Sequence, residues 1–422
     1  MELKPGYKQT EGGLIPEEWA TERLGSLVRH HNSGVYKKRE LYGRGWNIVG
    51  VSDLYDIHHV DGKVFARVPI SEQERAKYTL ACEDLLYGES SLVREGIART
   101  VYVTARGAGT AFAWHTRRYS VDQNILLSAY LYYYLQARPA RKHMMDQCIQ
   151  TAITGINTVA YFACPVPIPP LPEQRAIAGA LVDVDELIAS LGKLIAKKRD
   201  LKQAAMQQLL TGQTRLPGFN GKWKVKRLGE IGSTFGGLTG KTKSDFGEGS
   251  ARYITFMNIM TNVVIDPDTF EQVKVSPAES QNEVMKGDLL FNGSSETPEE
   301  VGMCAVLFDD VQNVFLNSFC FGFRFREDAE TNGLYLAYFF RSSEGRELLK
   351  SLAQGATRYN LSKTSLLKLN FPLPPLSEQT AIAAVLSDMD AELAALEARR
   401  DKTRGLKQGM MQELLTGRTR IV

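Results

Sequence analysis

The chain has 422 residues, 43% of them hydrophobic and 23% charged, and its 51 Lys and Arg residues nearly balance its 48 Asp and Glu residues. This length allows two or three domains, each with its own core. The near balance of charge excludes a protein that coats nucleic acid by bulk positive charge, so DNA contacts would have to come from local patches or from a partner.

The sequence also limits where the protein works. No apolar run reaches the roughly 18 residues of a membrane span, and the first residues lack the apolar core of a secretory signal. The five cysteines are isolated and odd in number, which favours free thiols over a disulfide framework or a zinc site. We therefore expect a cytoplasmic protein that does not enter a membrane.

The first domain is predicted to span residues 1–166. Short runs rich in β-branched and aromatic residues, such as residues 46–51 and 99–104, alternate with Gly, Asn, Asp and Ser, as is typical of strands joined by turns. A helical pattern follows near residues 124–135. Strands first and a helix last favour an α+β domain.

Residues 167–215 are predicted to hold one long helix. Pro169 and Pro170 cannot lie inside a helix, and the acidic Glu173 suits a first turn. Gly212 stands where helices commonly stop. Apolar residues recur at alternating steps of four and three, which is the pattern of a coiled-coil seam. The predicted seam residues are Ile177, Leu181, Val184, Ile188, Leu191 and Ile195.

The second half of the chain repeats the first. Residues 168–215 align without a gap onto residues 373–420, and 26 of the 48 paired positions are identical. This repeat indicates an internal duplication. It predicts a second domain at residues 216–372, with a helical pattern near 333–352, and a second long helix at residues 373–422. Its predicted seam residues are Ile382, Leu386, Met389, Leu393 and Leu396.

Shorter matches extend the duplication into the domains. Trp19 aligns with Trp223, and residues 83–91 (EDLLYGESS) align with residues 287–295 (GDLLFNGSS). Elsewhere the two domains differ strongly. We therefore predict an α+β fold built by tandem duplication of a globular domain plus a long helix, with the two helices packed on each other.

Candidate catalytic motifs are incomplete. Residues 236–242 (GGLTGKT) fall one residue short of a phosphate-binding loop, and no hydrophobic strand leads into them. All six histidines lie in the first domain, and adjacent pairs in loops lack the spacing of a helical metal site. We predict neither a catalytic residue nor a metal ligand.

Polar and basic loops occupy matching places in the two domains. Lys and Arg flanked by Ser, Thr, Asn and Gly suit contacts with phosphates and with the edges of bases, so we predict that these loops bind DNA. The predicted residues of the first domain are Lys37, Lys38, Arg39, Arg44, Ser90, Ser91, Arg94, Arg117 and Arg118. Those of the second are Thr239, Lys241, Thr242, Lys243, Asn292, Ser294, Ser295, Arg358, Tyr359 and Asn360.

The two helices that run from PPLxEQ to LLTG, the Trp-led starts, and the EDLLY and GDLLF segments together resemble the specificity subunits of type I restriction–modification systems. The resemblance covers nearly the whole chain. It implies two target-recognition domains that each read one half of a split, asymmetric site in double-stranded DNA. It also implies an antiparallel helix pair with pseudo-twofold symmetry that docks two modification (methyltransferase) subunits.

The resemblance further implies that S-adenosylmethionine, ATP, Mg and all catalysis belong to partner modification and restriction or translocase subunits in a prokaryotic cytoplasm. We thus expect a non-enzymatic subunit that recognises a DNA sequence. One alternative is a coiled-coil scaffold that gathers proteins without reading DNA, which footprinting of the copurified complex would separate. The other is an enzyme with an unrecognised centre, which would show turnover by the isolated chain.

Overall fold

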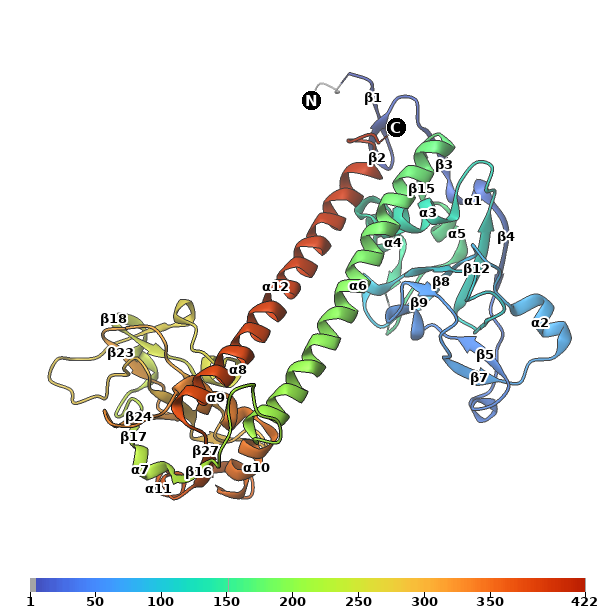
Figure 1. Ribbon diagram of the computed structural model, residues 1–422. Helices are drawn as coiled ribbons and strands as arrows, with labels where there is room; N and C mark the ends of the chain where they lie inside the picture. The colour runs from blue at the N-terminus through green and yellow to red at the C-terminus, as the bar shows by residue number, and fades with distance from the viewer. Residues whose placement is uncertain (1–4, 151, 422) are drawn as a thin grey trace. The chain divides into compact units, whose positions relative to one another are not determined.

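The computed structural model describes residues 5–150 and 152–421, which form two compact units (Figure 1). Unit 1 contains Met1–Gly192 and Arg399–Val422, and unit 2 contains Lys193–Ala398. Each unit therefore joins one globular domain to segments of two long helices, α6 (Leu171–Leu210) and α12 (Leu376–Leu414). None of the described helices is long and apolar enough to cross a membrane.

Unit 1 is built around a five-stranded sheet of order β4-β12-β8-β10-β6, in which only β10 and β6 pair in parallel. Two three-stranded sheets, β11-β5-β7 and β13-β14-β9, complete it. The strands of these sheets are β4 (Val28–Ser33), β5 (Trp46–Val49), β6 (His59–Val60), β7 (Ala66–Val68), β8 (Leu85–Gly88), β9 (Ser90–Ser91), β10 (Thr100–Val103), β11 (Ala111–Phe112), β12 (Thr116–Val121), β13 (Ile149–Gln150) and β14 (Thr154–Gly155).

Unit 2 repeats this plan. Its sheets have the orders β17-β24-β20-β22, β19-β18-β23 and β21-β26-β25, which reproduce the strand orders of unit 1 apart from β6. The strands are β17 (Gly232–Gly236), β18 (Phe246–Ile254), β19 (Glu271–Val273), β20 (Leu289–Asn292), β21 (Ser294–Ser295), β22 (Cys304–Val306), β23 (Val314–Leu316), β24 (Cys320–Phe325), β25 (Ala353–Gln354) and β26 (Tyr359–Leu361). The predicted duplication is therefore confirmed at the level of topology.

Short strand pairs and helices surround the sheets. The pairs are β1 (Tyr7–Thr10) with β2 (Gly13–Pro16), β3 (Ala20–Arg23) with β15 (Pro165–Ile168), and β16 (Lys224–Arg227) with β27 (Asn370–Leu373). The other helices are α1 (Leu24–Leu27), α2 (Glu72–Tyr78), α3 (Ser128–Gln136), α4 (Arg138–Gln147), α5 (Thr158–Phe162), α7 (Leu228–Ile231), α8 (Phe256–Thr261), α9 (Gly333–Arg341), α10 (Ser343–Ser351) and α11 (Lys363–Leu367).

One helix in each unit is buried on almost every side. The residues Tyr130–Leu135 of α3 and Leu334–Phe340 of α9 are all buried. Burying each large side chain contributes roughly 1.5–3 kcal/mol, so these two helices anchor the cores. The predicted helical stretch at 333–352 is two helices rather than one, because Ser342 ends α9 and its hydroxyl accepts a hydrogen bond from the Gly345 amide (3.2 Å) that starts α10.

The long helices begin and end as the sequence predicts. The Pro170 carbonyl accepts from the amides of Glu173 (2.9 Å) and Gln174 (3.0 Å), and Pro375 plays the same part in α12. Gly212 and Gly417 follow the helix ends with φ of 71° and 67°, which a residue with a side chain rarely adopts. The helices have 40 and 39 residues.

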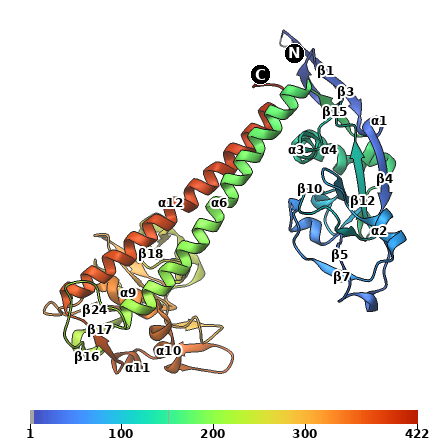
Figure 2. The same cartoon turned by 45° about the vertical axis from the view of Figure 1, so that its right-hand side comes forward.

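The two helices pair in both units (Figure 2). In unit 2, Lys198 contacts Glu392, and Lys202, further along α6, contacts Asp390, which lies earlier on α12. Residue numbers thus rise along one helix while they fall along the other, so the pairing is antiparallel. In unit 1, Lys407 of α12 binds Asp185 of α6 (2.6 Å).

The predicted seam is apolar and shielded along its length. The buried seam residues are Ile177, Leu181, Leu191, Ile195, Ile382, Leu386 and Leu393, and the half-buried ones are Val184, Ile188, Met389 and Leu396. The first part of each seam also joins a globular core. Ile177 and Leu181 pack in one cluster with Leu414 and Leu415 of unit 1. The start of α12 packs with the end of α6 in unit 2 in the same way.

Candidate nucleic-acid interface

A buried carboxylate in unit 1 fastens the start of α6 to the segment that follows α12. Glu173 accepts hydrogen bonds from the Trp19 indole nitrogen (3.1 Å) and from Arg420 Nη2 (2.6 Å). The Arg420 guanidinium also lies over the Trp19 ring, 5.8 Å from its centroid. Its hydrogen bond to Glu173 raises the pKa of Arg420. The group is neutralised and fully bonded, which is the condition under which a buried charge is tolerated.

The same group recurs in unit 2. Glu378 accepts from the Trp223 indole nitrogen (3.2 Å) and from Arg215 Nη2 (2.5 Å), and Arg215 lies 5.5 Å from the centre of the Trp223 ring. The sequence aligns Trp19 with Trp223 but gives no sign that either meets an arginine from beyond a helix end. The signal is that all three residues recur in the two copies: Trp19 and Trp223 are 204 residues apart, and Glu173 with Glu378 and Arg215 with Arg420 are each 205 residues apart.

A second repeated group lies where each domain meets the helix pair. In unit 1 the Tyr133 hydroxyl donates to Asp185 (2.9 Å), which also binds Lys407. In unit 2 the Tyr338 hydroxyl donates to Asp390 (2.7 Å), which also binds Lys202. Burial raises the pKa of both tyrosines, so each hydroxyl remains a donor. We call these two kinds of group, Trp–Glu–Arg and Tyr–Asp–Lys, the frame.

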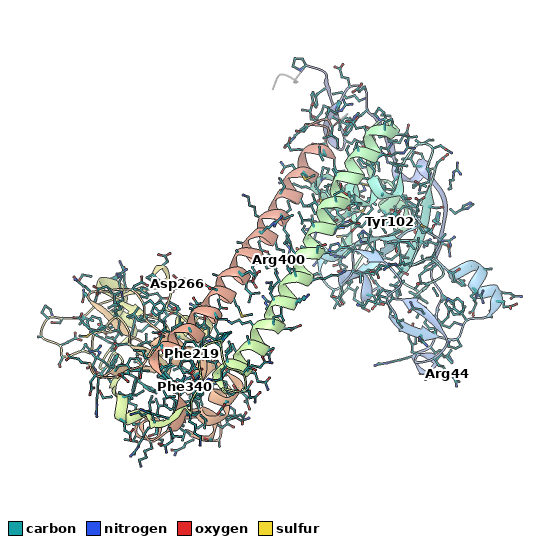
Figure 3. All side chains as sticks on the ribbon, in the orientation of Figure 1. Arg44, Tyr102, Phe219, Asp266, Phe340 and Arg400 are labelled. Carbon is teal, nitrogen blue, oxygen red and sulfur yellow. The ribbon has the colours of Figure 1, made fainter. Side chains whose placement is uncertain are left out.

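The basic loop of unit 1 lies at the end of the domain near β5 and β7, where Arg44 projects outward (Figure 3). Lys37 is held by Glu74 (2.8 Å). Lys38, Arg39 and Arg44 are exposed and form no ion pair with any other described residue. These three remain well placed for phosphate contacts, which stays a prediction.

The matching loop of unit 2 differs in its charge. Lys241 forms an ion pair with Glu279 (2.5 Å), which leaves 5% of the lysine side chain exposed, and that contact lowers the pKa of Glu279 to about 2. The Thr242 amide donates to Asp245 (2.7 Å). Thr239 and Lys243 are exposed. Lys241 therefore holds its own loop together, and Lys243 is the cation left facing solvent.

Several predicted DNA contacts turn out to hold loops from inside. The Asn292 amide is buried and donates to the carbonyls of Ser294 (3.2 Å) and Glu300 (3.0 Å). Ser91, Ser294 and Ser295 are also buried, and their strands β9 and β21 pair with β14 and β26. These four side chains are buried in this structure, and their part in DNA binding stays a prediction. Ser90 is half-buried.

The remaining predicted residues lie on exposed or half-exposed edges. Arg117 binds Glu89 (2.6 Å), and Arg118 donates to the Thr79 carbonyl (2.8 Å). Arg94 is exposed and donates to the Met145 carbonyl (2.9 Å). In unit 2, Tyr359 and Asn360 pair with β21, next to the exposed Arg358. The structure thus brings the 355–360 and 292–295 segments together, as the sequence alone could not show.

Comparisons with known proteins agree with this architecture. The family model described as "Type I restriction modification DNA specificity domain" matches residues 16–197 and again residues 220–403. A putative type I restriction enzyme MjaX specificity subunit from Methanocaldococcus jannaschii is 23% identical over 98% of this chain and 97% of its own. The EcoKI specificity subunit of Escherichia coli is 32% identical, over 20% of this chain and 18% of its own.

Solved structures share the fold. The S subunit of a type I restriction–modification system from M. genitalium has a TM-score of 0.57 at 15% identity, covering 98% of both chains. The HsdS subunit from Thermoanaerobacter tengcongensis has a TM-score of 0.51 at 18% identity, covering 96% of this chain and 98% of that one.

Two domains of one topology, each matched by this family model, define a tandem-repeat protein with two DNA specificity domains. The chain belongs to the type I restriction–modification DNA specificity family. It is a specificity subunit with two tandem target-recognition domains, and subunits of this family are in general not catalytic. The resemblance predicted from the sequence is confirmed.

Proposed function

We propose that each target-recognition domain reads one half of a bipartite, asymmetric site in double-stranded DNA, and that the chain directs methyltransferase and restriction subunits to that site. The observation that carries the proposal is the contrast between an identical frame and different loops. Both units keep the Trp–Glu–Arg and Tyr–Asp–Lys groups. Their exposed basic side chains differ in number and position. Two domains that share one frame but expose different basic side chains suit two different half-sites.

A similar groove in each unit also supports the binding of two copies of one partner. A groove of about 750 Å³ in unit 1 is lined by Gln408, Met411 and Gln412 together with the α3–α4 junction. A groove of about 880 Å³ in unit 2 is lined by Gln203, Met206 and Gln207 together with the α9–α10 junction. The helix residues are the same three types at the same spacing. We propose that each groove receives one methyltransferase subunit.

Catalysis is assigned by this proposal to the partners. S-adenosylmethionine, ATP and Mg would bind to the methyltransferase and restriction subunits, and the complex would act in a prokaryotic cytoplasm, where it meets DNA. In support, the chain contains no complete cofactor motif. The purified chain, free of partners, is expected to transfer no methyl group and hydrolyse no ATP.

Mapping methylated adenines in host DNA by single-molecule sequencing tests the reading proposal. We expect one interrupted, asymmetric motif that disappears when the gene is deleted and returns with a plasmid copy. A continuous motif, or a motif that survives deletion, would contradict the proposal. If the complex assembles but gives no footprint on DNA, the scaffold function stands instead.

The partner proposal is tested by subunit counting with native mass spectrometry. Gln203→Arg and Gln408→Arg each place a long cation in one groove, so each variant should lose one methyltransferase copy and the double variant should lose both. Gln73→Arg, on the exposed face of α2, is the matched control. Retention of two copies by the double variant would show that the grooves are not the docking sites.

A further inference from the structure

A tight joint in unit 1 brings the basic loop against the turn between β11 and β12. The Gly34 amide donates to the Thr116 carbonyl (3.0 Å), and the Trp114 amide donates to the Val35 carbonyl (2.9 Å). A Cβ atom on Gly34 would lie 2.1 Å from the Ala113 carbonyl oxygen. Only glycine allows this approach, so the loop and the turn form one tip.

Unit 2 contains the same joint. The Gly237 amide donates to the Cys320 carbonyl (3.3 Å), and the Leu238 amide donates to the Leu316 carbonyl (2.8 Å). A Cβ atom on Gly237 would lie 2.2 Å from the Asn317 carbonyl oxygen. The tip is therefore a repeated part of the fold, although the residues on it differ.

Each tip displays aromatic rings to solvent. In unit 1, Tyr36 and Trp114 are 64% and 49% exposed and meet edge to face with ring centroids 5.1 Å apart. In unit 2, Phe319 is 57% exposed, and the Arg358 guanidinium lies 5.6 Å from the centre of its ring. These rings belong to none of the buried clusters among the described residues. Packing of the fold does not explain why apolar rings stand at these positions. Burial of the rings against a ligand would release water from their apolar surface and so favour binding.

We propose that these rings read thymine, Trp114 with Tyr36 in one half-site and Phe319 in the other. The proposal rests on the proposed function, because it assumes that each domain reads one half-site. The C5 methyl of thymine is the one apolar group on the major-groove edges of the base pairs, and it is met by apolar side chains. Phe319 has no polar atom in its side chain, so its contact with a base must be apolar.

The charges around the rings fit the same ligand. Lys38 and Arg39 follow Tyr36 in the loop, and both are exposed. In unit 2, Arg358 lies over Phe319, and the exposed Lys243 lies in the adjoining loop. Cations beside an apolar contact would hold the phosphate backbone while the ring reaches the base edge. A protein surface has no such fixed alternation of anions and methyl groups, so the tips favour DNA over a protein partner.

The test uses the complex with its methyltransferase subunits and a duplex that carries the mapped site. Each thymine is replaced in turn by deoxyuridine, which removes only the C5 methyl group. We expect one replacement in each half-site to weaken binding about fourfold, the loss that corresponds to one buried methyl-sized group. Trp114→Ala and Tyr36→Ala should abolish the sensitivity in one half-site, and Phe319→Ala should abolish it in the other.

Two controls keep the result interpretable. Phe308→Ala removes a ring that is 43% exposed away from the tips and should leave both sensitivities intact. Trp114→Phe keeps an apolar ring and should retain the thymine preference, which separates lost contact from lost fold. Wild-type binding that ignores every deoxyuridine overturns the inference while the bipartite site still stands. A half-site without thymine overturns it as well. If no bipartite site exists, the proposed function fails first.

Discussion

Units 1 and 2 can be compared directly, because they are two copies of one fold in the same chain. The frame residues occupy equivalent positions and form equivalent contacts: a buried glutamate between a tryptophan and an arginine, and an aspartate between a tyrosine and a lysine. The tips share backbone geometry but not side chains. This difference separates the frame residues, which hold each domain to the helices, from the tip residues, which we propose to read DNA.

The two tips also differ in how many of their basic side chains are exposed. Unit 1 leaves Lys38, Arg39 and Arg44 exposed, whereas unit 2 sequesters Lys241 with Glu279 and leaves Lys243 exposed. Loops at matching places in the two domains therefore differ in their capacity to hold phosphate. The comparison predicts that frame substitutions act alike in the two units, whereas tip substitutions do not.

The largest effect is expected from the frame arginines. Arg420→Ala and Arg215→Ala each leave a buried glutamate without its cation, which costs about 3–5 kcal/mol. For units of this size that lowers the unfolding midpoint by roughly 10 °C, measured by calorimetry. Arg418→Ala removes a more exposed cation and is the control. A large loss in one unit alone would break the equivalence of the two frames.

A smaller effect is expected at the Tyr–Asp–Lys groups. Lys407→Met and Lys202→Met each remove one partly exposed ion pair, and we expect a loss of about 1 kcal/mol in denaturant unfolding. The Lys350–Glu299 pair is more exposed, so Lys350→Met should change the free energy of unfolding by much less. Equal losses in all three variants would show that the frame pairs gain nothing from their partial burial.

The two lysines of the unit 2 loop provide a test of whether exposure decides which basic side chains contact phosphate. Lys243→Ala should lower the slope of log affinity against log salt by about one, as expected for one lost phosphate contact. Lys241→Ala should leave that slope unchanged, because its ammonium group is already paired with Glu279. Binding is measured on the assembled complex between about 50 and 200 mM salt. Equal changes in slope would mean that Lys241 leaves Glu279 when DNA binds.

The smallest effect concerns pH and should be confined to unit 1, which holds all six histidines. Burial lowers the pKa of His59 below its ordinary value of 6.5, with Lys407 acting in the same direction and Asp185 and Asp61 opposing. Below pH 6.5 the unfolded chain therefore takes up a proton that folded His59 resists, so unit 1 loses stability as pH falls through this window. Calorimetry should show His59→Gln reducing that loss. An unchanged pH dependence in the variant would assign it to other groups.

The sequence predicted the parts of the fold that rest on local patterns. Apolar spacing, the Pro-Pro starts and the glycine stops define the long helices without reference to the rest of the chain. The break at Ser342 escaped prediction because apolar periodicity continues through it, and only the cap marks it.

The candidate site was harder to predict, because the exposure of its side chains depends on strands that are distant in the sequence. The segments that hold Ser90–Ser91 and Ser294–Ser295 look like polar loops, yet they form strands that pair with β14 and β26, more than 50 residues away in the sequence. Trp114 lies at the turn between β11 and β12, and only the tertiary structure shows that its ring is exposed. Ion pairing hides Lys241 in the same way, since Glu279 lies far along the chain.

The composition of unit 1 has a consequence for biosynthesis. Unit 2 is one continuous stretch, Lys193–Ala398, whereas unit 1 also requires residues from Arg399 onward, and Leu414 and Leu415 lie in its core. Domains usually complete their folding in the order in which the ribosome makes them. Here that order is reversed, because the core of the first domain to be translated cannot be completed until the second domain has been made. A message cut short after unit 2 would thus yield a protein whose first domain lacks part of its core.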